Sequence, residues 1–551
     1  MRPLLLLLTM VLCLQGQTPN PGEVQERRLA NGMRLLWVER RDLDAFHATL
    51  VLRGGRAEEP PALTGATDLL ARSLFGPAWP EDLATGKASQ EFDSMLKQEE
   101  GLMEALRLAR LRALPDVEST VSGLEASLQS VRGQLRTRLS TAPLTDLYAA
   151  AGGWQRAEGT EDALMVHTEL PLGAFDLWCQ TEHQRLSLLR ISRFYETKAA
   201  FLKEVRAKGA QALDLILGAA LPGHPYGRNF RDHLPAIEAM RASELRTYTR
   251  RTLNPEHMAL IVVSSLSLDR SLPALEAAFG SLPMPPENEE TLLAEIPSDL
   301  GDRRVQVNLG EAPSLLAAWR IPPRSHQDHL ALRMAAQILD GGHTSRIQAR
   351  LVGGKALAKS ATLLMDLPGA RLPGLLLAEL VPAEGHSLEE VEAALHSEIL
   401  RLQQEPIAPE EWTRALAQLE VDHLRILDEP AALARALGHA WVETGDWHRL
   451  DLEMQRLRTL QPEAVQAAVR TWLTASHRTT ALLRPALLEN SNPLDLRTNR
   501  VLQALAALRV EDPAQREHLV TEGARQLRML SLPERLRTLE LLEAQLPQEK
   551  R

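Results

Sequence analysis

The sequence predicts an α+β protein built from two similar units, each with an antiparallel-rich sheet and helices on one face. Its 551 residues exceed the size of one ordinary domain, and 44% of them are hydrophobic, enough for large cores. A helix followed by a strand occurs twice: residues 241–250 precede 253–263, and residues 461–470 precede 475–485. An internal duplication is the economical interpretation of this repeat.

The composition changes along the chain divide it into five segments. Pro283 to Glu290 is rich in proline and charge, which is typical of a linker. Leucine and arginine at helical spacing follow the second repeat. We therefore predict a signal peptide at 1–17, a first unit at 18–285, a linker at 286–300, a second unit at 301–486 and a helical tail at 487–551.

The first residues are typical of a secretory signal peptide. Arg2 supplies the positive charge, and the apolar run from Pro3 to Leu14 is too short to span a bilayer. Lipid attachment at Cys13 and a buried N-terminal helix are the alternatives. No later stretch has 18 uninterrupted apolar residues, so we expect a periplasmic or secreted protein without an integral membrane segment. After cleavage Cys179 is the one remaining cysteine, which excludes an intramolecular disulfide.

A helical hairpin is predicted as an insertion in the first unit, at about residues 91–139. Val117, Val121, Leu124, Leu128, Val131 and Leu135 alternate spacings of four and three, as in a coiled-coil seam. Pro115-Asp116 separates this segment from an earlier helix with Leu96, Met103 and Leu106. Two ordinary core helices are the alternative, and we expect the hairpin to project as a surface for a partner or as a self-packed decoration.

Charge and motifs exclude several classes of function. A formal net charge of -10 argues against a broadly basic nucleic-acid surface. The sequence contains no P-loop, no glycine-rich dinucleotide fingerprint, no nucleophile elbow and no paired-cysteine zinc spacing. Neither HEXXH nor HXXEH occurs among its 16 histidines. We interpret these histidines as solvated or core residues.

Several segments together resemble the insulinase and pitrilysin family of zinc peptidases, which includes the mitochondrial processing peptidases. The resemblance covers about residues 25–485 and is carried by residues 29–38, 54–75, 222–227, 338–346 and 355–359. It implies two α+β units and a helix after the turn at Gly65 that carries HXXEH. In that motif two histidines bind zinc and the glutamate is the general base.

This chain departs from the family at each of those positions. The resemblance places Asp68 and Arg72 where the histidine ligands belong, and Ala71 where the base belongs. It places Glu204 at the third ligand position, on a later helix. A catalytic zinc site needs three protein ligands and an open position for water. We therefore expect no catalytic residues and no bound zinc, with Glu204 as a remnant of the ligand set.

The second unit shows a partial loss of the same kind. An arginine and a tyrosine contact substrate in the family, and the resemblance places Arg346 and Lys359 at these positions. The resemblance implies a non-catalytic member that joins a catalytic subunit as a heterodimer, or forms a homodimer, and helps to enclose peptide. The alternatives are a stand-alone extracytoplasmic binding or scaffold protein and an active metallopeptidase with unusual ligands.

The charges left at the degenerate site predict its structure. Asp68 and Arg72 are spaced i and i+4, where opposite charges on a helix meet. A buried Glu204 without a cation would be costly. We expect the Arg72 guanidinium to bond Asp68, Glu204 or both in place of the metal. The alternative is an Arg72 that points to solvent and a Glu204 that is protonated or hydrated.

Overall fold

The computed structural model describes residues 23–75, 86–111, 117–139, 144–187, 191, 193–208, 211–284, 301–309, 312–354, 356–484, 493–510, 513–528, 530 and 532–546. These residues form two compact units, one within 1–305 and 314–482 and a smaller one within 306–313 and 483–551. The expected signal peptide and linker lie outside the described residues. Within the described part of the chain, every helix is too short or too polar to cross a bilayer.

The first half of the larger unit is built on a six-stranded sheet in the order β1-β2-β6-β3-β5-β4. Only β2 and β6 pair in parallel, and the other neighbours are antiparallel. The strands are β1 (Val24–Arg28), β2 (Arg34–Glu39), β3 (Ala45–Arg53), β4 (Trp154–Gly159), β5 (Ala163–Pro171) and β6 (Met258–Ser264). All seven residues of β6 are buried, as a continuous apolar run predicts for a strand covered on both faces.

The second sheet repeats the strand order of the first. It has five strands, in the order β7-β11-β8-β10-β9. They are β7 (Arg303–Asn308), β8 (Ser314–Ile321), β9 (Ala358–Leu367), β10 (Gly374–Pro382) and β11 (Arg478–Arg484). Counted within each half from β2 and from β7, both sheets follow the order first, fifth, second, fourth, third. The prediction of two similar α+β units is confirmed.

The repeated helix-then-strand pattern is also confirmed. Before β6 come α10 (Ala242–Thr252) and the short 3₁₀ helix η6 (Pro255–His257). Before β11 come α17 (Pro462–Trp472) and the 3₁₀ helix η9 (Ala475–His477). In each half, a helix, a 3₁₀ helix and a strand therefore follow one another, and this strand lies between the first and second strands of that half.

Helices cover one face of the first sheet. They are α2 (Ala66–Ser73), α5 (Leu144–Ala150), α6 (Phe175–Ser187), α7 (Phe194–Lys208), α9 (Leu234–Ala239), α10 and α11 (Leu268–Leu275). Their core includes the rings of Phe46, Phe175 and Trp178, which meet edge to face or at a tilt. Helix α8 (Ala212–Ala220) instead contacts β8 of the second sheet. The second half has α12 (His329–Asp340), α13 (Leu388–Gln404), α14 (Pro409–Asp428), α15 (Pro430–Thr444) and α16 (Arg449–Thr459).

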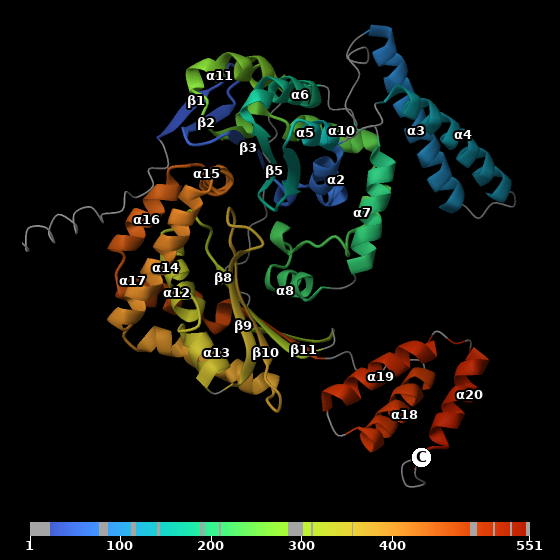
Figure 1. The fold of residues 1–551 in the computed structure, drawn as a ribbon, viewed down its shortest axis with the longest axis vertical. Helices are drawn as coiled ribbons and strands as arrows, with labels where there is room; N and C mark the ends of the chain where they lie inside the picture. Colours follow the sequence, from blue (N-terminus) through green and yellow to red (C-terminus); the bar gives the residue numbers. More distant parts are fainter. Residues whose placement is uncertain are drawn as a thin grey trace, which may run out of the picture. The chain divides into compact units, whose positions relative to one another are not determined.

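A helix of the second half covers the other face of the first sheet. Leu433, Leu437 and Trp441 on α15 form one buried cluster with Val51 and Ile261 of the sheet. Helix α15 packs against β3 and β6, and Figure 1 shows it just below β2. Gly438 makes this close approach possible, because a Cβ there would lie 2.9 Å from the Val51 Cγ2 atom. The two halves therefore share one of their cores.

A polar clasp also joins the halves. The loop from β9 to β10 is bound by Asp162, whose Oδ2 atom accepts hydrogen bonds from the backbone N–H groups of Ala370 (3.0 Å) and Arg371 (3.1 Å). Tyr226 donates its hydroxyl proton to Asp162. The Arg371 guanidinium donates to Glu58 at 2.6 Å. Charged groups from the first half thus fix a loop of the second half.

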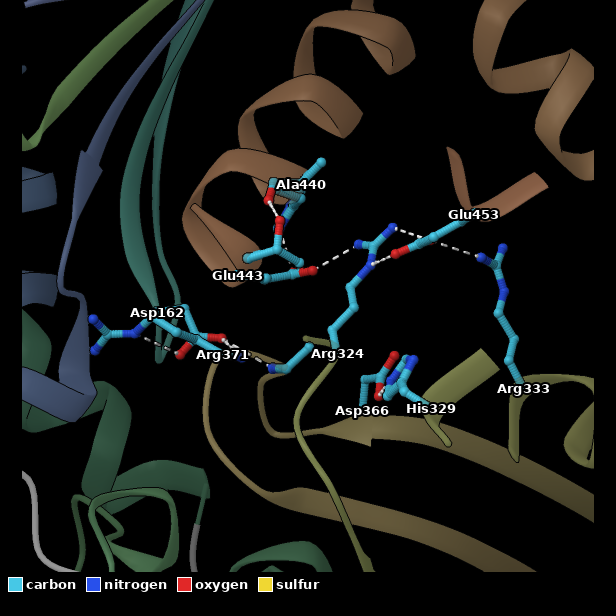
Figure 2. Close-up of polar contacts among 12 residues, drawn as sticks. Asp162, Arg324, His329, Arg333, Asp366, Arg371, Ala440, Glu443 and Glu453 are labelled. Atoms are coloured by element: carbon cyan, nitrogen blue, oxygen red, sulfur yellow. Dashed lines mark hydrogen bonds and ion pairs between the residues drawn. The ribbon is translucent and has the colours of Figure 1, made fainter. Parts of the chain in front are cut away.

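Arg324, a residue of the second half, binds the same loop between β9 and β10. The Arg324 backbone N–H donates to the Ala370 carbonyl at 2.9 Å. Its guanidinium donates to Glu453 on α16 at 2.7 and 2.8 Å and to Glu443 on α15 at 2.6 Å. Figure 2 shows Arg324 between these two carboxylates. Such bidentate bonds fix geometry as well as charge, so the clasp is connected to the helices that cover the first sheet.

The predicted hairpin consists of α3 (Gly86–Leu111) and α4 (Val117–Arg138). The two helices lie side by side, as Figure 1 shows, and share an apolar cluster of Phe92, Leu96, Val131, Leu135 and Leu139. The predicted seam is therefore confirmed at its C-terminal end. The smaller unit contains the expected tail helices α18 (Pro493–Arg509), α19 (Pro513–Arg528) and α20 (Leu532–Glu543).

Gly438→Ala is expected to lower the free energy of unfolding by about 1 to 3 kcal/mol, because the added methyl group overpacks the α15 contact. The matched control is Gly101→Ala in α3, where an added Cβ meets nothing within 4 Å. That variant should gain about 0.5 to 1 kcal/mol from helix propensity. Denaturant unfolding of both variants measures the difference, and equal effects would contradict the proposed role of Gly438.

Candidate functional site

Helix α2 is the element that carries the degenerate motif, and a buried carboxylate fixes its start. Gly65 precedes the helix with φ of 92°, a left-handed conformation that favours glycine. Glu59 accepts hydrogen bonds from the backbone N–H groups of Gly65 (2.8 Å) and Thr67 (2.6 Å). Burial raises the pKa of Glu59 to about 7 although both bonds act in the opposite direction.

Arg72 binds Glu204, as predicted. Its two terminal nitrogens donate to the two carboxylate oxygens of Glu204 at 2.9 and 2.8 Å, joining α2 to α7. The Arg72 hydrogen bond lowers the pKa of Glu204. The expectation of a buried Glu204 is wrong, because the side chains of Arg72 and Glu204 are 37% and 50% exposed. The pair lies at the surface, where water screens it.

Asp68 has a different partner from the one expected. It does not pair with Arg72; Arg56 donates to its two oxygens at 2.7 and 3.0 Å and to Glu161 at 3.0 Å. Burial alone would lower the pKa of Arg56, but the bonds to Asp68 and Glu161 raise it above its ordinary value. Arg56 comes from the turn that follows β3, before α2. Sequence reasoning missed it because no helical spacing relates it to Asp68.

Two aromatic rings separate the two ion pairs. The Arg72 guanidinium lies 5.1 Å from the centre of the Phe201 ring, and the Arg56 guanidinium lies 5.4 Å from the centre of the Phe230 ring. Phe201 and Phe230 meet edge to face, 5.2 Å apart. Arginine over an aromatic face is a favourable cation–π arrangement. Side chains of this chain thus surround the place where the resemblance puts the family's metal.

The donor set at this position does not fit zinc. Glu204 is engaged by Arg72, Asp68 is engaged by Arg56, and Ala71 supplies no donor. A permanent guanidinium charge beside each carboxylate opposes a divalent cation. Among the described residues no group of three or more His, Cys, Asp or Glu side chains could hold a metal ion.

The other predicted site residues do not join this cluster. Ala71 is 6% exposed and packs into the first core. Arg346 is buried, and its guanidinium donates to Glu411 on α14 at 2.7 and 2.8 Å. Lys359 lies exposed on β9. Arg346 is therefore committed to a structural ion pair, and Lys359 is the accessible member of the predicted substrate-binding pair.

An open strand edge lies beside α2. Strand β4 is the last strand of the first sheet on this side, and a Cβ on Gly159 would lie 3.1 Å from the Thr67 side chain. Trp154, Arg156 and Glu158 alternate along β4 as exposed residues. An edge strand offers backbone N–H and C=O groups to a further strand. The edge therefore provides a place where an extended peptide could pair next to α2.

Histidines line a small pocket on the face of this sheet that α15 covers. His47, His167, Trp154, Arg156 and Arg435 are among its lining residues. His167 is 5% exposed. Burial, with the nearby Arg156 and Arg435, lowers the pKa of His167 to about 4. The interface between sheet and α15 therefore holds a neutral histidine at physiological pH.

Comparison with known proteins identifies the class. Residues 239–419 match the family described as the peptidase M16 inactive domain. A protease from Helicobacter pylori has the same fold, with a TM-score of 0.66 and 14% identity over 84% of this chain and 100% of that chain. The first half of the periplasmic protease PqqL from Escherichia coli gives a TM-score of 0.59 and 13% identity over 91% and 96%.

Two further matches extend this result. A chain of complex III2 from Candida albicans gives a TM-score of 0.60 and 12% identity over 84% of this chain and 96% of that chain. An uncharacterized zinc protease of Mycobacterium leprae (strain TN) is 26% identical over 161 residues, which are 28% of this chain and 35% of that relative. The match thus spans about a third of the relative's length. The fold is peptidase-like, and the chain resembles the M16, or insulinase, family.

The two ion pairs at α2 should differ in their effect on stability. Arg72→Ala is expected to lower the free energy of unfolding by about 1 kcal/mol or less, because the pair is exposed. Arg56→Ala should cost about 3 kcal/mol or more, since it leaves the more buried Asp68 and Glu161 without a cation. Urea unfolding of both variants tests this order, and an equal or reversed cost would contradict it.

The neutral state of His167 predicts a pH dependence. His167 binds a proton near pH 6.5 in the unfolded chain and only near pH 4 in the folded chain. It therefore lowers the free energy of unfolding as the pH falls between these values. As the pH falls from 7 to 5, the free energy of unfolding of His167→Asn should therefore rise by about 2 kcal/mol relative to that of the wild type. The exposed His343→Asn serves as the control in the same unfolding series. A parallel response of both variants would show that His167 is not held neutral.

Proposed function

We propose that this chain is a non-catalytic M16-family protein that binds extended peptide segments and works beside a catalytic zinc peptidase subunit. The observation that supports the proposal is the bidentate Arg72–Glu204 pair, which joins two of the positions that the resemblance assigns to zinc ligands. Zinc hydrolases use their metal to polarise the carbonyl and to activate water. A guanidinium bound to a carboxylate supplies no water of lowered pKa and no base.

The surroundings support binding without hydrolysis. Asp68 and Glu161 are both bonded to Arg56, so neither is free to act as a general base. Strand β4 still presents its edge beside α2, and its exposed Trp154 and Arg156 can contact peptide side chains. Backbone pairing gives affinity for extended peptides of many sequences. The site thus keeps the means to hold a peptide after losing the means to cleave it.

A partner would supply the chemistry that this chain lacks. The similar chain from Candida albicans belongs to complex III2, which supports a subunit role for this fold. The hairpin of α3 and α4 extends the first half and offers a surface for such a partner. The apolar segment after Arg2 and the similarity to a periplasmic protease support an extracytoplasmic location.

Restoring the motif tests the lost-site interpretation. The variant Asp68→His, Ala71→Glu, Arg72→His recreates HXXEH with Glu204 as the third ligand. We expect elemental analysis to find about one zinc per chain in this variant and less than about a tenth of that in the wild type. The two-position control Asp68→His, Arg72→His lacks the base, so it should bind zinc without cleaving a quenched peptide.

Two results would contradict the proposal. Chelator-sensitive peptide cleavage by the wild-type chain would show that it is an active peptidase. Purification from its own organism without any peptidase subunit, under mild conditions, would remove the partner role and favour a stand-alone binding protein.

A further inference from the structure

The pocket between the first sheet and α15 contains buried ring nitrogens that have no hydrogen-bond partner among the described residues. His167 on β5 is 5% exposed, and its Nε2 atom is one of them. The Nδ1 atom of His47, on the neighbouring strand β3, is another. A buried polar group without a partner is costly. The two nitrogens therefore indicate that the pocket takes a further group.

The free nitrogen of His167 can act as a donor. The Nδ1 atom of the same ring lies 3.1 Å from the Thr49 hydroxyl, which can donate its proton to it. The low pKa of His167 keeps the ring neutral at physiological pH, so the ring carries one proton, and this proton is then on Nε2. An N–H group that is buried in this way needs an acceptor, such as an oxygen atom.

Two guanidinium groups line the same pocket. They belong to Arg156 on β4 and Arg435 on α15, and neither forms a hydrogen bond among the described residues. The Arg156 guanidinium lies 5.3 Å from the centre of the Trp154 ring. Arg435 lies 3.8 Å from Glu429, measured from Nη2 to Oε2. Because guanidinium groups match the geometry of carboxylates, the pocket provides positive charge as well as donors.

The start of α15 adds to this positive potential. Ala431, in the first turn of the helix, lines the pocket, and no side chain caps the helix N-terminus. The free N–H groups at the start of this 15-residue helix attract an anion. The helix start and the free His167 nitrogen therefore favour the same class of ligand.

Three nearby carboxylates restrict the charge of that ligand. Glu158 lies 4.0 Å from Nε2 of His167, and Glu169 lies 3.6 Å from Nδ1 of His47, both beyond hydrogen-bond distance. Together with Glu429, they repel a dianion more strongly than a monoanion. The free space of the pocket is about that of one water molecule. This space admits one oxygen of a carboxylate better than a whole phosphate group.

We propose that this pocket binds a monovalent carboxylate, from the C-terminus of a peptide or from a small organic acid. One carboxylate oxygen accepts the Nε2 proton of His167, and the guanidinium groups of Arg156 and Arg435 neutralise the charge. The pocket lies on the opposite face of the sheet from α2. Binding here therefore requires neither the degenerate zinc position nor strand pairing at β4.

The test follows the His167 ring in the full chain by nuclear magnetic resonance, with ¹³C at the histidine Cε1 positions. The signal is identified by its loss in His167→Asn. Sodium acetate and the tripeptide Ala-Ala-Ala with a free carboxyl group should shift the signal to saturation. The C-terminal amide of the same tripeptide, inorganic phosphate, and sodium chloride at matched ionic strength should not.

Arg435→Gln separates the pocket from the β4 edge, because Arg435 lies on α15. This variant should weaken acetate binding at least about fivefold. The matched control is Arg425→Gln on α14, whose parent side chain is 74% exposed, and it should leave the affinity unchanged. Glu158→Gln removes the carboxylate beside His167 and should strengthen acetate binding.

Three results would overturn the proposal. A His167 signal that responds to neither acetate nor the tripeptide acid would show that the pocket holds water only. An equal response to chloride or phosphate would show an unselective anion site. Acetate binding that Arg435→Gln leaves unchanged would place the carboxylate elsewhere. A response to acetate without one to the tripeptide acid would support the carboxylate site and assign it to small organic acids.

Discussion

The carboxylates of Asp68, Glu161 and Glu204 lie around α2, and each needs a positive partner. The residues that supply these positive charges determine the chemistry of the candidate site in the first half. A metal ion would draw several ligands to one point. Here Arg56 and Arg72 neutralise separate carboxylates, and a Phe201–Phe230 pair lies between the two guanidinium groups. The helix is held against α7 by the Arg72–Glu204 ion pair and by the contact of the Arg72 guanidinium with the Phe201 ring.

The duplication gives the protein two sheets of one strand order but places them in different surroundings. The first sheet is covered on both faces, because α15 of the second half packs on it through Gly438. The clasp at Asp162 and Arg371 fixes the same interface with polar bonds. With both of its faces covered, the first sheet can meet another chain at its strand edges.

Much of the fold could be predicted because it is set by local patterns. The heptad spacing identified the α3–α4 hairpin, and the repeated helix-then-strand pattern identified α10 with β6 and α17 with β11. The role of α15 could not be predicted in this way. Its apolar face packs on strands of the first half, which lie far earlier in the chain. Helical periodicity shows that a face is buried without showing what covers it.

The candidate site likewise has some features that the sequence determined and others that only the tertiary structure decided. The sequence by itself determined the absence of HXXEH, the charges of Asp68 and Arg72 and the presence of Glu204, because these are properties of residue identity and spacing. Only the tertiary structure decided that Arg72 binds Glu204 at an exposed surface, that Arg56 takes Asp68 and Glu161, and that Arg346 is held by Glu411. The physical reason is that an ion pair is formed by whichever opposite charge the fold brings within bonding distance. Sequence spacing fixes that distance only inside a single helix or strand.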